Sequence, residues 1–299
     1  MKNILVTGGK GQLASCIKDV SGNLDNLNFI YVDIDQLDIT DIKSVKTFFE
    51  KNNVSYCINC AAYTAVDKAE SNKEMAERIN VLGARNLAIA CKSNDAVLIH
   101  ISTDFVFDGV NTKPYNEEDK VNPLSIYGLT KLNGELVIAD SLKEYFIIRT
   151  SWLYSEHGNN FLKTMLRLGS ERENLGVVID QLGTPTYAGD LAKAIMTIIC
   201  VNSSAFGLYH YSNEGVASWY DFAHAIFEFK DENITWDCEI SKYTNASSYY
   251  TVKEDGEKVS MIKFCKKLDN NPDYNIIFKN TSHYLFDISV IENYFKKYK

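Results

Sequence analysis

The residues best suited to chemistry in this 299-residue sequence are a tyrosine and a lysine four positions apart, Tyr127 and Lys131. In a helix this spacing places both side chains on one face. A phenol ordinarily has a pKa of about 10, and a neighbouring ammonium group lowers it. Such a phenol is suited to give a proton to a ketone oxygen during reduction. On an exposed helix the same spacing would be an ordinary surface pair.

A second polar element, Ser102-Thr103-Asp104, follows the apolar run 97–101. If that run is a strand of a parallel sheet, these residues lie at its carboxyl end, where open α/β sheets bind ligands. The Thr103 hydroxyl could then hydrogen-bond a substrate carbonyl beside Tyr127. The alternative is that Thr103 only caps a turn.

A glycine-rich turn follows the first apolar run and precedes a helical pattern, with Gly8 and Gly11 in the sequence TGGKGQLA. Glycines here let the backbone approach a pyrophosphate, which binds the amides at the start of the helix. A lone glycine motif is weak, because any tight turn can produce one. The order of glycine turn, strand-end hydroxyl and YxxxK is far more specific, and it predicts a nicotinamide-dependent reductase.

The adenosine end of such a cofactor would lie near Asp33, which ends the second apolar run. An acid there accepts hydrogen bonds from ribose hydroxyls and favours NADH. Asp33 could equally be a solvated strand end, and Asp38 with Ile39 could flank the adenine. The sequence therefore leaves open whether the cofactor is NADPH or NADH.

The elements that must position these residues alternate between short apolar runs and amphipathic stretches. Strands are predicted at 4–6, 29–32, 56–59, 97–101 and 145–148, and helices at 12–20, 42–52, 74–93 and 124–141. The alternation predicts an α/β fold with a doubly wound parallel sheet.

The domain organisation changes after residue 150. We expect residues 1–150 to form a dinucleotide-binding domain, with a returning strand and helix near 176–201. Residues 151–299 should form mainly a smaller, interleaved substrate-binding lobe. Beyond about 230 the periodicity is weak.

Charge and composition narrow the class of partner. A net charge of -8 argues against nucleic acid or an anionic membrane as the main partner. The seven scattered cysteines are expected to be free thiols in a reducing compartment. Cys57 and Cys60 would point to opposite faces of a strand and could not readily share a metal. Without a signal-peptide core or a membrane-length apolar run, a cytoplasmic location is expected.

Four runs of sequence carry a family resemblance: NCAAYTAVDKAE (59–70), STDFVFDG (102–109), RTSWLY (149–154) and DQLGTPT (180–186). With the motifs above, they closely resemble the extended short-chain dehydrogenase/reductase family, and within it the dTDP-4-dehydrorhamnose reductases. The resemblance implies a Rossmann-type fold. It also implies NAD(P)H-dependent reduction of dTDP-4-dehydro-L-rhamnose to dTDP-L-rhamnose, for polysaccharide biosynthesis.

The resemblance also implies roles for single residues. Tyr127 would be the proton donor, Lys131 its partner and cofactor-ribose ligand, and Thr103 the group that stabilises the carbonyl oxygen. Besides these, the cofactor would contact Gly8, Gly11, Gln12, Leu13, Asp33, Asp38, Ile39, Ala62, Tyr63 and Thr64. Thr103, Asp104 and Trp152 would line the sugar site, although Trp152 could instead be a core aromatic of the lobe.

Some positions depart from the family pattern. Phe105 stands where tyrosine is frequent, and residues 230–280 look unrelated, although 284–291 resemble the family's final strand and helix start. Some relatives form a metal-linked dimer through a carboxylate in the first helix. Ser15 and Cys16 stand there, so no metal is expected, and a homodimer remains open.

Two alternatives to this function remain. The chain could be a 4-ketoreductase for another nucleotide-linked 6-deoxyhexose, which the departures motivate. It could also be a non-catalytic nucleotide-binding regulatory subunit on the same fold.

Overall fold

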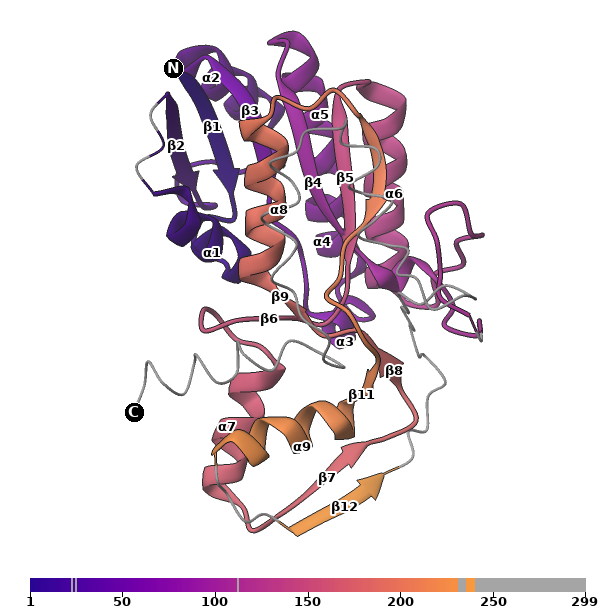
Figure 1. Ribbon diagram of the computed structural model, residues 1–299. Helices are drawn as coiled ribbons and strands as arrows, with labels where there is room; N and C mark the ends of the chain where they lie inside the picture. Colours follow the sequence, from indigo (N-terminus) through magenta and orange to yellow (C-terminus); the bar gives the residue numbers. More distant parts are fainter. Residues whose placement is uncertain (23, 25, 112, 231–234, 240–299) are drawn as a thin grey trace.

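The computed structural model describes residues 1–239 except 23, 25, 112 and 231–234. Its centre is a parallel sheet with the strand order β10-β5-β4-β3-β1-β2 (Figure 1). The strand bounds are β1 Lys2–Thr7, β2 Leu27–Val32, β3 Val54–Asn59, β4 Val97–Thr103, β5 Tyr145–Thr150 and β10 Gly207–His210. The five strands expected from the apolar runs of the first 150 residues are all present.

Helices cover both faces of this sheet because its strands are apolar on both sides. Their bounds are α1 Gln12–Ser21, α2 Ile42–Asn52, α5 Ala84–Ser93, α6 Ile126–Ser141 and α8 Ala188–Cys200. One core packs α1 and α8 against alternate strand residues such as Ile4 and Ile99. The opposite core packs α2, α5 and α6 against residues such as Leu5 and Leu98. The predicted doubly wound α/β fold is therefore confirmed.

The helix expected over 74–93 is divided in the structure. It consists of α4 (Lys73–Glu77), a π-helical stretch η1 (Arg78–Gly83) and α5. The stretch lies very close to α6, since a Cβ added to Gly134 would lie 2.4 Å from the carbonyl oxygen of Asn80. Short elements complete this half of the chain: α3 Val66–Ala69 and the 3-10 turn η2 Asp104–Val106.

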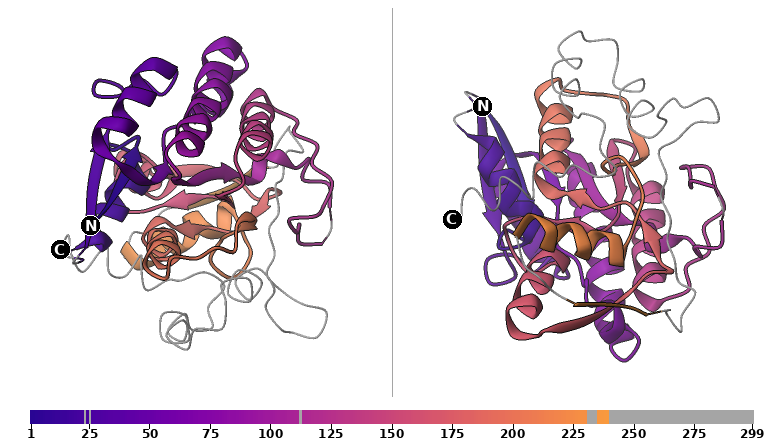
Figure 2. Two further views of the ribbon diagram at one scale, coloured as in Figure 1. Left: turned by 90° about the horizontal axis from the view of Figure 1, so that it is seen from above. Right: turned by 60° about the horizontal axis from the view of Figure 1, so that its bottom comes forward.

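The rest of the described chain packs below the carboxyl ends of the strands (Figures 1 and 2). It contains α7 (Phe161–Glu171), β7 (Asn174–Val178), α9 (Trp219–Lys230) and β12 (Thr235–Glu239). A separate apolar cluster from α7, β7 and α9 forms its core. The short strands that connect it to the sheet are β6 Leu153–Tyr154, β8 Leu182–Gly183, β9 Thr186–Tyr187 and β11 Ala217–Ser218.

The returning strand expected near 176 lies elsewhere. β7 pairs with β12 in a separate two-stranded sheet, whereas α8 does return to the central sheet and β10 is the strand that joins β5. Alternation in β7 explains this, because Leu175 and Val177 are buried while Asn174 and Gly176 are exposed. A strand with one buried face does not suit the interior of a parallel sheet.

Two further expectations concern cysteines and the C-terminal segment. Cys57 lies in the core beneath α2 and α5, and Cys60 packs against the other core, so the two do face opposite ways. The expected strand and helix start at 284–291, and the segment 240–280, lie outside the described residues. Among the residues that are described, no helix combines the length and the apolar character needed to cross a membrane.

Candidate active site

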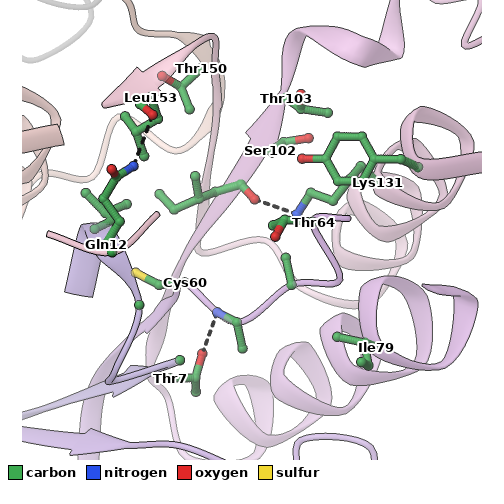
Figure 3. Close-up of a pocket in the computed structure, with 18 of the residues that line it drawn as sticks. Thr7, Gln12, Cys60, Thr64, Ile79, Ser102, Thr103, Lys131, Thr150 and Leu153 are labelled. Atoms are coloured by element: carbon green, nitrogen blue, oxygen red, sulfur yellow. Dashed lines mark hydrogen bonds between the residues drawn. The ribbon is translucent and has the colours of Figure 1, made fainter. Parts of the chain in front are cut away.

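A cavity of about 960 Å³ runs along the carboxyl ends of the central strands (Figure 3). Its walls come from the glycine turn, the ends of β2, β4 and β5, the start of α6 and the first residue of α9. Predicted site residues that line it are Gly8, Gly11, Gln12, Leu13, Asp33, Asp38, Ile39, Ala62, Thr64, Thr103, Asp104, Tyr127, Lys131 and Trp152. Sequence segments more than 200 residues apart thus meet in one cleft.

Tyr63 is the exception among the predicted residues. It is absent from the cavity wall, whereas its neighbours Ala62 and Thr64 are part of it. The backbone of Tyr63 is held by Asn80, whose amide accepts from the Tyr63 N–H at 2.8 Å and donates to the Tyr63 carbonyl at 3.2 Å. In an extended segment adjacent side chains point to opposite sides, which explains why the middle residue is turned away.

The glycine turn is built for close approach of a ligand to the backbone. Gly8 has φ +62°, and a Cβ there would lie 2.9 Å from the Ala61 nitrogen, so only glycine fits without strain. Gly11 is the N-cap of α1 and no side chain caps this helix end. The first amides of α1 are therefore free to bind an anion, as the sequence predicts.

Gln12 has a structural contact in addition to its place at the cleft. Its Nε2 donates to the Leu153 carbonyl at 3.1 Å, and its Oε1 accepts from Asn160 Nδ2 at 2.6 Å. The glycine turn and the lower lobe are therefore joined directly beside the cavity (Figure 3).

At the far end of the cavity, partly exposed acids lie beside two basic groups that were not predicted from the sequence. Asp33 accepts a hydrogen bond from the backbone N–H of Lys10 at 3.1 Å. The Lys10 ammonium lies 3.0 Å from Asp35, and the Arg78 guanidinium lies 3.5 Å from Asp38. Both basic residues line the cavity. The position of Lys10 within the glycine turn is a signal in the sequence that it lies near the cofactor site. No sequence motif marks Arg78, which reaches the cavity only because of the fold.

The three residues expected to carry the chemistry come together at the other end. Thr103 ends β4, and Tyr127 and Lys131 come from the first two turns of α6. The Thr103 hydroxyl donates to Asp104 Oδ1 at 3.0 Å and lies near enough to Tyr127 to lower the pKa of that phenol. The Lys131 ammonium donates to the Ile101 carbonyl at 2.6 Å, and Lys131 is only 2% exposed (Figure 3). The predicted constellation of hydroxyl, phenol and ammonium is thus a single site.

The electrostatics of Tyr127 differ from the expectation. Burial raises the pKa of this phenol to about 12, the Thr103 hydrogen bond acts in the opposite direction, and the Asp104 charge raises it further. Burial also lowers the pKa of Lys131 to about 8, against the influence of Glu135 and Cys60. Lys131 does not depress the pKa of Tyr127 here, because desolvation dominates both groups. The phenol is protonated at neutral pH, the form that donates a proton.

Two residues at the start of α6, a serine cap and a glycine, let the helix pack closely against the end of β4. The Ser125 hydroxyl caps the helix by accepting from the Gly128 N–H at 3.0 Å. A Cβ on Gly128 would lie 2.2 Å from the Phe105 carbonyl oxygen, so a glycine one residue after Tyr127 is required for this packing. The ring of Phe105 meets Tyr127 edge-on, with centroids 5.5 Å apart.

A buried ion pair fixes α6 further along. Glu135, one turn after Lys131, accepts from Arg149 of β5 at 2.6 and 2.9 Å and from the Ser102 hydroxyl at 2.5 Å. Both side chains of the pair are at most 5% exposed. This pair was not predicted from the sequence, although a YxxxKxxxE spacing places all three side chains on one helical face.

Trp152 and Trp219 stack where the lower lobe meets the cleft. Their rings are parallel within 6° with centroids 3.5 Å apart. The Trp219 indole N–H donates to Gln181 Oε1 at 3.2 Å. Trp152 has φ +45°, an unfavourable conformation for a bulky residue. It both packs against the lobe core and lines the cavity, so the two interpretations of Trp152 are compatible.

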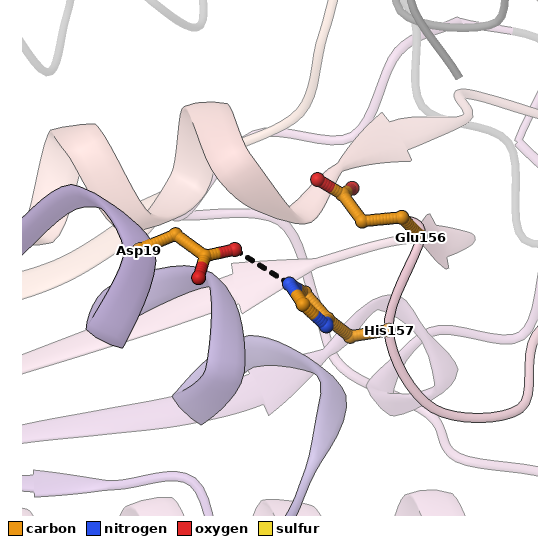
Figure 4. Close-up of side chains that lie close together, drawn as sticks. All are labelled: Asp19, Glu156 and His157. Carbon is orange, nitrogen blue, oxygen red and sulfur yellow. Dashed lines mark hydrogen bonds and ion pairs between the residues drawn. The ribbon is translucent and has the colours of Figure 1, made fainter. Parts of the chain in front are cut away.

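Outside the cavity, two carboxylates and an imidazole connect α1 to the loop after β6 (Figure 4). His157 Nε2 lies 2.5 Å from Asp19 Oδ2. One ring nitrogen of His157 and one carboxylate oxygen each of Asp19 and Glu156 lie within 4.8 Å of one another. Glu156 also accepts from the Tyr187 hydroxyl at 3.1 Å. These contacts hold the loop against α1, close to Gly158, which lines the cavity.

Comparison with known proteins agrees with this geometry. A family model described as "RmlD substrate binding domain" matches residues 1–249. The dTDP-4-dehydrorhamnose reductase of Aggregatibacter actinomycetemcomitans is 40% identical over 232 residues, which are 76% of this chain and 79% of that protein. The dTDP-4-keto-6-deoxy-D-glucose reductase of Streptomyces niveus is 41% identical over 226 residues, covering 75% of this chain and 77% of that one.

A solved structure is similar over the whole chain. The dTDP-4-dehydrorhamnose reductase of Bacillus anthracis, determined in complex with NADP, has a TM-score of 0.84 and 33% identity, with complete coverage of both chains. The fold is that of the extended short-chain dehydrogenases/reductases, a Rossmann-type parallel sheet with a lobe below its carboxyl edge. Within that class, the chain belongs to the RmlD substrate binding domain family.

Proposed function

We propose that this protein is an NAD(P)H-dependent reductase of the 4-keto group of dTDP-4-dehydro-L-rhamnose, giving dTDP-L-rhamnose for polysaccharide biosynthesis. The observation that carries the proposal is the convergence of Thr103, Tyr127 and Lys131 in a cleft that also contains the glycine turn. A binding module has no need for a partly buried proton donor beside a strand-end hydroxyl and a buried ammonium. The relatives named dTDP-4-dehydrorhamnose reductase support the choice of substrate.

The residues of the cleft fit a nicotinamide dinucleotide. The uncapped amides of α1 and the open backbone at Gly8 provide a cradle that a pyrophosphate would fill. Asp33, Asp38 and Ile39 would hold the adenosine, with Lys10 and Arg78 available to a 2′-phosphate. Basic groups beside acids suit NADPH and NADH alike, and the Bacillus anthracis relative is in complex with NADP.

Bound in this cleft, a reduced nicotinamide dinucleotide would be the source of the hydride for the substrate carbon. The Thr103 hydroxyl donates a hydrogen bond to the carbonyl oxygen and holds it beside Tyr127. The phenol, protonated at neutral pH, gives its proton to that oxygen as negative charge develops there. The Lys131 ammonium, one turn further along α6, would bind the cofactor ribose and hold it beside the phenol. Asp104 and Trp152 would line the sugar site.

A second candidate is the reduction of another nucleotide-linked 6-deoxyhexose. Phe105 favours it, because its ring lies against Tyr127 without a hydroxyl to offer the sugar. The Streptomyces niveus relative, 41% identical, is named for a different 4-keto sugar. Turnover of several nucleotide-4-keto sugars with NADPH and NADH, with the sugar product identified, separates the two candidates.

The decisive variant is Tyr127→Phe. It should bind NADPH normally and lose turnover by about a hundredfold or more, since general acid catalysis is typically worth that much. Leu129→Ala, an exposed change on the same helix, is the matched control. Near-normal turnover of Tyr127→Phe would remove the acid from the mechanism. Absence of NAD(P)H oxidation with every keto sugar would instead favour the regulatory alternative.

The proposal includes a cytoplasmic location and a homodimer. Buried free thiols such as Cys57 and Cys91 suit a reducing compartment, which supports the location. Cell fractionation tests the first part, and light scattering of the purified protein tests the second.

A further inference from the structure

Three polar side chains form one row across the central sheet. Thr7 of β1 is paired with Asn59 of β3, and Asn59 is paired with His100 of β4. Each stands two residues after an apolar residue of the α5/α6 face, so all three point to that face. On the same face, the side chains two residues earlier on each strand are the apolar Leu5, Cys57 and Leu98. The row is therefore an exception that requires a partner, and α6 is the helix above it.

The row is hydrogen-bonded from end to end and ends at Lys131. Thr7 Oγ1 lies 2.7 Å from Asn59 Oδ1, Asn59 Nδ2 lies 2.9 Å from His100 Nδ1, and His100 Nε2 lies 3.2 Å from Lys131 Nζ. All four residues are at most 2% exposed. Water is thus excluded, and each polar atom depends on its neighbour in the row.

The protonation state of Lys131 determines the direction of these hydrogen bonds. A neutral imidazole has one donor and one acceptor nitrogen. If Asn59 Nδ2 donates to Nδ1, Nε2 carries the proton, and it can face only an uncharged amine. An ammonium at Lys131 requires Nε2 to accept. Nδ1 then carries the proton, and the Asn59 amide must turn its oxygen toward it.

We propose that His100 is a positioning residue of the reductase: its Nε2 accepts a hydrogen bond from the Lys131 ammonium, and Asn59 selects this tautomer by accepting from Nδ1–H. This rests on the role given to Lys131 in the proposed function. Exchanging the two ends of the Asn59 amide leaves the heavy atoms in place. The amide nitrogen then donates to the Thr7 hydroxyl oxygen.

Other groups around Lys131 are consistent with this assignment. Burial and the Lys131 charge both lower the pKa of His100 well below its usual range, so the imidazole is neutral at neutral pH. Glu135 of α6 and Cys60 after β3 are the groups that raise the pKa of Lys131. Tyr127 lies one turn before it on the same helix. With the Ile101 carbonyl as the second acceptor, one N–H of the ammonium remains for the cofactor ribose.

The tautomer of His100 can be measured directly in the intact protein. In ¹⁵N-histidine-labelled protein with NADPH at pH 7, we expect His100 to carry its proton on Nδ1. When the pH is raised above the pKa of Lys131, about 8, the proton should move to Nε2. An Nε2–H tautomer at pH 7 overturns the proposal. This experiment requires no variant and no sugar substrate.

Variants give a second test with a readout that a merely structural role would not change. His100→Leu should lower kcat/KM about tenfold or more and move its alkaline limb about one pH unit lower, because the ammonium loses a buried acceptor. His100→Gln, whose amide oxygen can replace Nε2, should recover most of both. Thr197→Val removes a buried hydroxyl on α8, beyond the sheet, and is the control.

An unchanged alkaline limb in folded His100→Leu overturns the proposal. The pH dependence of NADPH affinity, followed by fluorescence, provides the same comparison without a sugar. If the wild-type protein reduces no keto sugar, the proposed function fails, and the NADPH titration and the tautomer still decide the role of His100.

Discussion

Removing the charge of Glu135 tests whether the buried ion pair holds α6 in place. Glu135→Gln keeps the shape of the side chain but leaves the Arg149 guanidinium without its counterion, at a site where both side chains are at most 5% exposed. Three short contacts are affected: two from Arg149 and one from Ser102. Breaking a buried pair from one side costs about 3–5 kcal/mol.

The expected measurement is a loss of about 3–5 kcal/mol in the free energy of unfolding by urea. For a chain of this size, the melting temperature should fall on the order of 10 °C. The double variant Glu135→Leu/Arg149→Met should recover much of that stability, because an apolar replacement of a buried pair is often neutral. Its turnover should stay low if the pair also sets the position of Lys131. Arg167→Gln, which breaks the exposed pair with Glu171, is the control and should cost under about 1 kcal/mol.

A loss below about 1 kcal/mol for Glu135→Gln would refute this reasoning, since it would mean that the guanidinium finds other partners or water. Wild-type turnover in the double variant would show that stability and catalysis are independent here.

Two further predictions concern pH and the sugar end of the cleft. Lys131 acts as a cation and its pKa is about 8, so kcat/KM should fall as the pH rises through about 8; Tyr127, with a pKa of about 12, stays protonated throughout. A pH–rate profile that is flat to pH 10 would contradict this. Gly183→Ala would place a Cβ 2.3 Å from the Trp152 ring, so KM for the sugar should rise about tenfold while the NADPH affinity is unchanged. Leu182→Ala, at the exposed preceding position, is its control, and equal KM values for the two would show that Trp152 does not contact the sugar.

The sequence was sufficient for the sheet and for most of the cleft. Strands that are buried on both faces can be recognised in the sequence as continuous apolar runs, and the residues at their carboxyl ends lie along one edge of the parallel sheet. Arg78 could not be predicted, because its place at the cleft depends on the π-helical stretch between α4 and α5. The strand expected to return to the sheet near 176 was wrong, because β7 buries only alternate residues and pairs with β12 instead.

The expectation that Lys131 lowers the pKa of Tyr127 was also wrong, and the reason is physical. The spacing to Lys131 correctly indicated a shared face, yet the effect of a neighbouring cation depends on how deeply both groups are buried. Desolvation raises the pKa of the phenol and lowers that of the ammonium, which opposes the expected attraction. The spacing in the sequence indicates how far apart two side chains lie on a helix, but it does not indicate how exposed those side chains are to solvent.

The polar residues inside the apolar strands explain how the acid–base pair is held in place. His100 and Ser102 are two residues apart on β4, and they meet Lys131 and Glu135, which are four residues apart on α6. Side chains two apart on a strand are about 6.6 Å apart, and side chains four apart on a helix about 6 Å. The two spacings match, so both contacts form in only one register of the helix on the sheet. A shift of α6 by one turn would bury a carboxylate against His100 and leave Arg149 unpaired. The same register places Tyr127, one turn earlier, beside Thr103 at the strand end.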